Sequence, residues 1–145
     1  MEQYDYIDDL CKFLDSSPVN FLAVDTVRRR LDAEGFERLD PREAWEINRG
    51  GRYYVTKNDS AIFAFTVGDS DPEDGFRIIA AHSDSPGFRI KPDCEILCDG
   101  NIVKLNTEVY GGPILYTWFD RPLSIAGRVM LRGQDPLRPI SRLVR

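Results

Sequence analysis

The stretch FRIIAAHSDSPG, Phe76–Gly87, carries the strongest signals for both the fold and the chemistry of this chain. Its first half, Phe76–Ala81, is apolar at nearly every position, which is typical of a strand covered on both faces of a sheet. We therefore expect a central strand of an α/β fold here. His82 and Asp84 come next, and the Ser-Pro-Gly after them is expected to turn the chain away from the strand.

His82 and Asp84 have the residue types and the spacing of a metal ligand and its supporting carboxylate. In an extended backbone residues i and i+2 point to the same face, so the two side chains would lie side by side. Ligand sites of open α/β sheets form beyond the carboxyl ends of the strands. Neutral imidazole is a good zinc ligand, and a carboxylate can accept its second N–H. By spacing alone, an ordinary hydrogen-bonded pair is favoured over a metal ligand, because a catalytic zinc needs about three protein ligands and the chain has one histidine.

Two helices and a hairpin are expected before this stretch. Apolar residues recur at three- and four-residue steps over residues 5–14 and again over 19–31, which predicts a helix with one apolar face in each segment. β-branched and aromatic residues then fill Arg52–Lys57 and Ser60–Val67. Asn58 and Asp59 separate these two runs, and the arrangement predicts a β-hairpin.

The chain changes character after Pro92. The helical periodicity gives way to short strand-like runs broken by glycine and proline, namely Glu95–Leu97, Asn101–Asn106, Ile114–Phe119 and Ser124–Leu131. We therefore place a boundary near residues 91–93, with an α/β segment before it and a mostly β segment after it.

Charge and composition exclude several kinds of partner. The 24 acidic residues against 19 lysines and arginines give a formal net charge of -5, which disfavours binding to a phosphate backbone, so no nucleic-acid partner is expected. No apolar stretch approaches the ~20 residues of a membrane span. The first ten residues are acidic, whereas a secretory signal is basic and then apolar. We expect a cytoplasmic protein with no membrane partner and with its three cysteines reduced.

A second notable stretch is VYGGPILYTWFDRPLSIAGRV, Val109–Val129. Its Gly-Gly pair lacks the strand-to-helix context and the lysine of a phosphate-binding loop, which disfavours a nucleotide site. Asp120 and Arg121 are expected to form a chain reversal or an ion pair. Cys94 and Cys98 stand without a second Cys/His pair, so two ordinary thiols are favoured over a zinc knuckle.

The stretch around His82 and the stretch Val109–Val129 closely resemble two signatures of the aspartyl aminopeptidase family of cocatalytic zinc exopeptidases. The matching residues are AHSDSPGFRIKP, Ala81–Pro92, and Val109–Val129 in the same order. FLDSSPVNFLAVD, Phe13–Asp25, and GFERLDPREAW, Gly35–Trp45, are similar to the family's N-terminal region. The resemblance runs from about residue 4 to residue 131. Pro113 stands where many relatives carry a third glycine, which affects loop stiffness more than the assignment.

The resemblance implies a metalloaminopeptidase, a hydrolase that removes N-terminal, typically acidic, residues from peptides with two zinc ions. His82 matches the first metal ligand of the family, and Asp84 matches the catalytic-site aspartate that supports it. The resemblance also implies an α/β/α catalytic domain interrupted by a β-rich insert that mediates oligomerisation. Residues 1–91 would begin the catalytic domain and residues 92–145 the insert, so a homo-oligomer is expected of the complete protein. No residue of this chain is assigned to substrate binding.

Two functional hypotheses follow. The first is the N-terminal portion of a metal-dependent aminopeptidase acting on peptide substrates, with the 145-residue chain inactive alone because the family's other site residues would lie beyond Arg145. The second is a non-catalytic interaction module that keeps the front half of the fold for assembly. A free sheet edge left by the missing half would favour strand pairing with another subunit.

Overall fold

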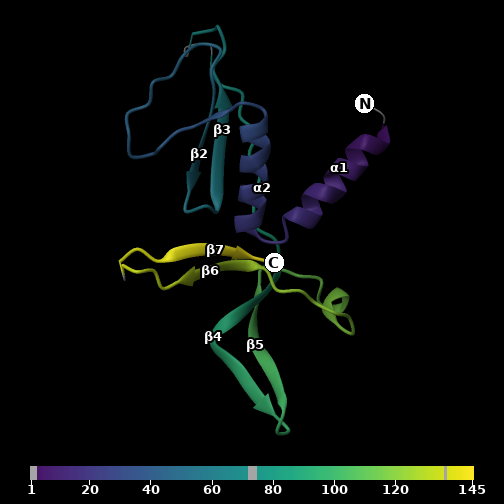
Figure 1. Cartoon of the computed structure of the whole chain (residues 1–145). Coiled ribbons are helices and arrows are strands. Elements are labelled where there is room, and N and C mark those ends of the chain that lie inside the picture. The colour runs from purple at the N-terminus through teal and green to yellow at the C-terminus, as the bar shows by residue number, and fades with distance from the viewer. Residues whose placement is uncertain (1–2, 72–74, 136) are drawn as a thin grey trace. The chain divides into compact units, whose positions relative to one another are not determined.

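A computed structural model describes residues 3–71, 75–135 and 137–145 (Figure 1). Its elements fall into two compact units. The first contains the residues up to Asp84 together with Ile125–Arg145, and the second contains Ser85–Ser124. Strand β4 of the second unit, Gly87–Cys98, runs through residues 91–93. The assignment of residues 1–91 and 92–145 to two domains stays a prediction.

Two helices open the first unit, and both predictions of helix are confirmed. Helix α1 spans Gln3–Ser16 and helix α2 spans Asn20–Ala33. The apolar face of α2 is covered, with Leu22 and Val24 buried, whereas the apolar residues of α1 are largely exposed. Helix α2 is therefore the helix that contributes to the core of this unit.

A three-stranded sheet packs beside α2 (Figure 1). The strands are β1 (Glu37–Arg38), β2 (Arg52–Lys57) and β3 (Ala61–Thr66) in the order β1-β2-β3. β1 runs parallel to β2, while β2 and β3 form the predicted hairpin, paired from Arg52 with Thr66 to Lys57 with Ala61. The core of this unit consists of Leu22, Val24, Leu39, Tyr53 and Tyr54.

The predicted strand at Phe76–Ala81 is wrong in this structure. These residues form no strand, and Phe76, Ile78 and Ile79 expose 82%, 77% and 100% of their surface. The apolar run signals burial, but a strand also needs neighbours that satisfy its backbone groups. Among the described residues, no strand pairs with this segment.

The chain returns to the first unit as a second hairpin, β6 (Gly127–Leu131) with β7 (Ile140–Val144). β6 confirms the later part of the strand predicted over Ser124–Leu131. β7 was not expected, because its sequence shows no apolar alternation. In the structure every one of its residues is exposed. β6 contacts α2, so the hairpin is tied to the body of the unit.

The second unit is built on a long hairpin of β4 and β5 (Ile102–Tyr110). Their register shifts between Ile90 and Glu95, which is a β-bulge. The predicted strand at Ile114–Phe119 is wrong, because Leu115–Trp118 forms a 3₁₀ turn, η2. The Thr117 hydroxyl donates to the Ile114 carbonyl at 2.7 Å, a local bond that competes with an extended backbone.

Within the described ranges, neither helix combines the length and the apolar character that crossing a bilayer requires.

Candidate metal site

His82 lies in an irregular segment that follows the exposed apolar residues. Its side chain is 81% exposed. Solvent can therefore reach the ring, as a metal ligand requires. The two ring nitrogens have different hydrogen-bond partners, and this difference determines which of them can bind a metal ion.

Nδ1 of His82 lies 2.8 Å from the backbone carbonyl oxygen of Asp84. A carbonyl oxygen can only accept a hydrogen bond, so Nδ1 must carry the proton and donate it. In the neutral ring the lone pair then resides on Nε2. No described residue hydrogen-bonds to Nε2. The local geometry thus fixes the tautomer in which Nε2 can accept a metal ion.

The carboxylate of Asp84 lies beside the same ring nitrogen, with Oδ1 3.4 Å from Nδ1 of His82. The two side chains are therefore neighbours, although the carbonyl of Asp84 is the closer acceptor.

Ser83, between these two residues, faces the protein. Its hydroxyl donates to the backbone carbonyl of Ser60 at 2.9 Å. The sequence pattern did not single out Ser83. The available signal was alternation, because the residue between two side chains on one face of an extended backbone points to the other face.

The described residues supply one candidate ligand and no complete metal site. No group of three or more His, Cys, Asp or Glu side chains able to hold a metal ion occurs among them. Cys94 and Cys98 are free thiols in β4, as is Cys11 in α1. The donor chemistry of His82 fits one zinc ligand of the usual three or four.

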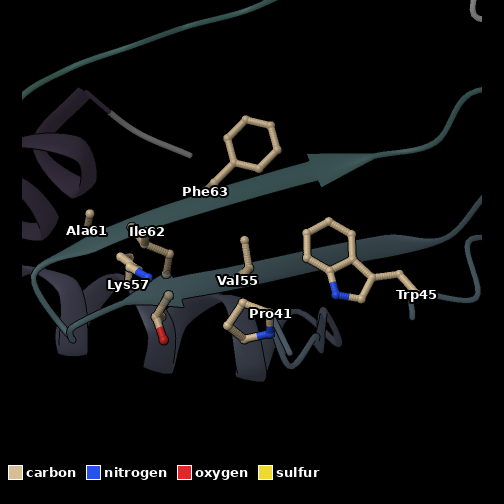
Figure 2. Close-up of a pocket in the computed structure, with 8 residues that line it drawn as sticks. Pro41, Trp45, Val55, Lys57, Ala61, Ile62 and Phe63 are labelled. Carbon is tan, nitrogen blue, oxygen red and sulfur yellow. The ribbon is translucent and has the colours of Figure 1, made fainter. Parts of the chain in front are cut away.

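A surface hollow of about 350 Å³ lies on the β2–β3 hairpin and differs in chemistry from the His82 segment. Figure 2 shows Pro41 and Trp45 beside the strand that carries Val55. The lining is largely apolar and holds no His, Cys, Asp or Glu; it consists of Pro41, Trp45, Val55, Thr56, Lys57, Ala61, Ile62 and Phe63. The hollow therefore offers apolar contact and no metal ligand.

Comparison with protein families gives the class of this chain, that of the zinc metalloproteases. The family described as aminopeptidase I zinc metalloprotease (M18) matches residues 13–145. The chain belongs to the M18 family. It is 54% identical over 140 residues to the probable M18 family aminopeptidase 2 of Clostridium novyi (strain NT), a match that covers 96% of this chain and 32% of that protein. The chain thus spans about a third of the length of this curated relative.

Solved structures place the same residues in the N-terminal part of the M18 fold. The structure of mApe1 from Chaetomium thermophilum matches with a TM-score of 0.89 and 32% identity, covering 97% of this chain and 32% of that one. The mApe1 dodecamer of S. cerevisiae matches with a TM-score of 0.87 and 25% identity, covering 99% and 34%. The expected fold class, the start of an α/β zinc-exopeptidase fold, is confirmed.

Proposed function

We propose that this chain is the N-terminal part of a zinc-dependent aminopeptidase that removes acidic N-terminal residues, Asp or Glu, from peptides. Membership of the M18 family supports the hydrolase class and the metal. The preference for acidic residues and the presence of two ions per complete site rest on the resemblance of residues 81–92 and 109–129 to aspartyl aminopeptidases.

The observation that carries this proposal is the orientation of the His82 ring. Nδ1 donates to the Asp84 carbonyl, so Nε2 presents its lone pair to solvent without a rearrangement of the ring. His82 would hold zinc through Nε2. The chemistry that zinc supplies when bound is that of a Lewis acid, which polarises a peptide carbonyl and activates water for attack.

Asp84 has a supporting role in the same proposal. Its carbonyl holds the tautomer, and its carboxylate lies 3.4 Å from Nδ1, where it would help to orient the ring. Neither group needs to touch the metal. Asp84 would therefore influence the rate of the reaction more than the occupancy of the site.

The isolated chain is proposed to be inactive, because the described residues hold no group of three candidate metal ligands around His82. The exposed apolar segment at residues 76–81 supports the same conclusion. Contiguous large apolar residues at a surface mark a place that another part of a protein covers. The two thirds of the M18 length absent from this chain would provide that cover.

We assign residues 1–91 to the start of the catalytic domain and residues 92–145 to the start of a β-rich insert that mediates homo-oligomerisation. The insert assignment is supported by the β4–β5 hairpin, most of which follows residue 91 and which lies in the second unit. The dodecameric state named for the S. cerevisiae relative supports a homo-oligomer of the complete protein. Its proposed location is the cytoplasm.

A peptidase assay tests this function directly. The isolated chain and the full-length M18 polypeptide that carries it (the full-length enzyme) are each given chromogenic aspartyl and leucyl substrates with zinc. We expect turnover of the aspartyl substrate by the full-length enzyme alone. Preference for the leucyl substrate would contradict the acidic specificity, and turnover by the isolated chain would contradict the assignment of the other ligands to absent residues.

A further inference from the structure

The segment that carries His82 is hydrogen-bonded to the turn between β2 and β3. Asn58 and Asp59 have φ values of 53° and 55°, and positive φ at both central residues is the signature of a type I′ hairpin turn. The Ser60 N–H closes this turn by donating to the Lys57 carbonyl at 3.1 Å. Six strand pairs behind it hold the turn in place. Backbone carbonyls of such a turn are well-positioned acceptors.

One of these carbonyls is held by Arg128 of β6. Its Nη1 donates to the Asn58 carbonyl at 2.8 Å and lies 3.9 Å from Oδ2 of Asp59. The guanidinium carbon also sits 4.2 Å from the ring centroid of Phe21 in α2, a cation–π distance. Arg128 thus joins the turn to α2 and to β6, which is 70 residues further along the chain.

Another carbonyl of the turn is held by Ser83. The Ser83 hydroxyl donates to the Ser60 carbonyl at 2.9 Å across 23 residues of sequence. Ser83 is the residue between His82 and Asp84, so this bond fixes the backbone from which both side chains project. The preceding residues 76–81 pair with no described strand and leave the segment without sheet support on that side.

We infer that Ser83 and Arg128 are positioning residues of the candidate metal site, acting on His82 through the Asn58–Ser60 turn. The inference rests on the proposed function in that His82 is the ligand. Ser83 holds the Asp84 carbonyl where Nδ1 of His82 can donate to it, and this bond keeps the lone pair on Nε2. Arg128 holds the turn against α2, so that the acceptor for Ser83 does not move.

The tautomer of His82 is the direct readout of this inference. Since His82 is the only histidine of the chain, ¹⁵N-histidine labelling gives ring signals from this residue alone. The ¹⁵N shifts of a neutral imidazole ring distinguish Nδ1–H from Nε2–H. We expect the Nδ1–H form in the unmodified chain, a shift toward Nε2–H in Ser83→Ala, and the original spectrum in Ser83→Thr, which keeps the hydroxyl.

Thr26→Val is the matched control. The Thr26 hydroxyl also donates to a backbone carbonyl, that of Ser16 at 3.3 Å, in the same unit. This variant is expected to lower stability and leave the His82 tautomer unchanged. The inference is overturned if Ser83→Ala keeps the Nδ1–H form, if Thr26→Val shifts the tautomer equally, or if Ser83→Ala loses the folded state while Thr26→Val keeps it.

Zinc affinity in the full-length enzyme gives the second readout. Replacing a group that orients a ligand typically weakens metal binding by ~10-fold or more, and we expect this of Ser83→Ala. A smaller loss is expected of Arg128→Met, which keeps the aliphatic stem and removes the donor. Saturating zinc should restore most of kcat in both variants. Unchanged affinity in both would overturn the inference.

The two accounts fail in distinguishable ways. If His82→Ala leaves zinc binding and aminopeptidase activity intact, the proposed function fails, while the tautomer of His82 still measures whether Ser83 positions the ring. If His82→Ala abolishes zinc binding but Ser83→Ala changes neither tautomer nor affinity, the positioning inference fails and the proposed function stands.

Discussion

Nδ1 of His82 is 2.8 Å from the carbonyl oxygen of Asp84 and 3.4 Å from the carboxylate oxygen of the same residue. The backbone therefore fixes the ring, and the carboxylate adds charge. In the full-length enzyme we expect Asp84→Ala to leave most of the zinc bound while lowering kcat by at least ~10-fold. Metal analysis and steady-state kinetics measure the two effects separately. Loss of the metal together with the rate would show that the carboxylate itself is a ligand.

A substitution in the exposed apolar segment at residues 76–81 should affect the stability of the isolated chain and of the complete protein differently. Ile79 is fully exposed, so Ile79→Lys should change the stability of the isolated chain by no more than about 0.5 kcal/mol. In the full-length enzyme the same variant should lose about 3 kcal/mol or more if this segment becomes a buried strand. Chemical denaturation of both forms provides the comparison. Ile79→Val is the control that keeps an apolar side chain, and an equally mild effect of Ile79→Lys in both forms would refute burial of the segment.

The packing of α2 on the sheet depends on a buried phenol. Tyr54 is 1% exposed, and its hydroxyl donates to Oδ1 of Asp32 at 2.6 Å. Burial raises the pKa of Tyr54, and the hydrogen bond to Asp32 raises it further. Tyr54→Phe should destabilise the unit by about 1.5 kcal/mol, because the acceptor is charged. Tyr53→Phe, which removes an acceptor of the Asn48 N–H, is the comparison, and equal thermal shifts would argue against a special role for the charged partner.

Acid should lower the stability of helix α2 by protonating Asp25. Burial raises the pKa of this carboxyl, but hydrogen bonds from Arg28 at 2.7 Å and Arg29 at 2.6 Å more than offset it, so the net pKa is lowered from 3.8. A carboxyl with a lowered pKa in the folded state stabilises above its unfolded pKa and loses that effect as pH falls through the folded pKa.

The measurement for Asp25 is the stability of Asp25→Asn against the unmodified chain at several pH values. Above about pH 5 the variant should be less stable by about 1 kcal/mol, since the pair is partly exposed. The difference should shrink steadily as the pH falls below the unfolded pKa of 3.8. A difference that does not depend on pH would contradict the assigned ion pairs.

The sequence predicted those helices and turns whose formation depends on residues close together in the chain. The periodic apolar residues of α1 and α2 and the Asn58-Asp59 turn of the first hairpin act over a few residues, and all three elements are present. The segment at 76–81 failed because burial of a strand depends on neighbours distant in sequence. η2 was mistaken for a strand because the bond from Thr117 to Ile114 is invisible in a pattern of apolar residues.

The candidate site was only partly accessible to sequence reasoning. Residue type and spacing identified His82 and Asp84, and the structure places their side chains next to each other. The carbonyl that fixes the ring carries no sequence signal, because every residue has one. Arg128 and Ser83 reach one turn from positions 45 residues apart in the chain, a relationship that only the three-dimensional fold provides.

The zinc content of the His82→Ala variant of the full-length enzyme, measured together with kcat/KM on an aspartyl substrate, tests the central claim most directly. The account predicts loss of zinc from one position and a fall in kcat/KM of at least ~100-fold. A variant that keeps the full zinc content and the unmodified kcat/KM would show that this imidazole is not a ligand.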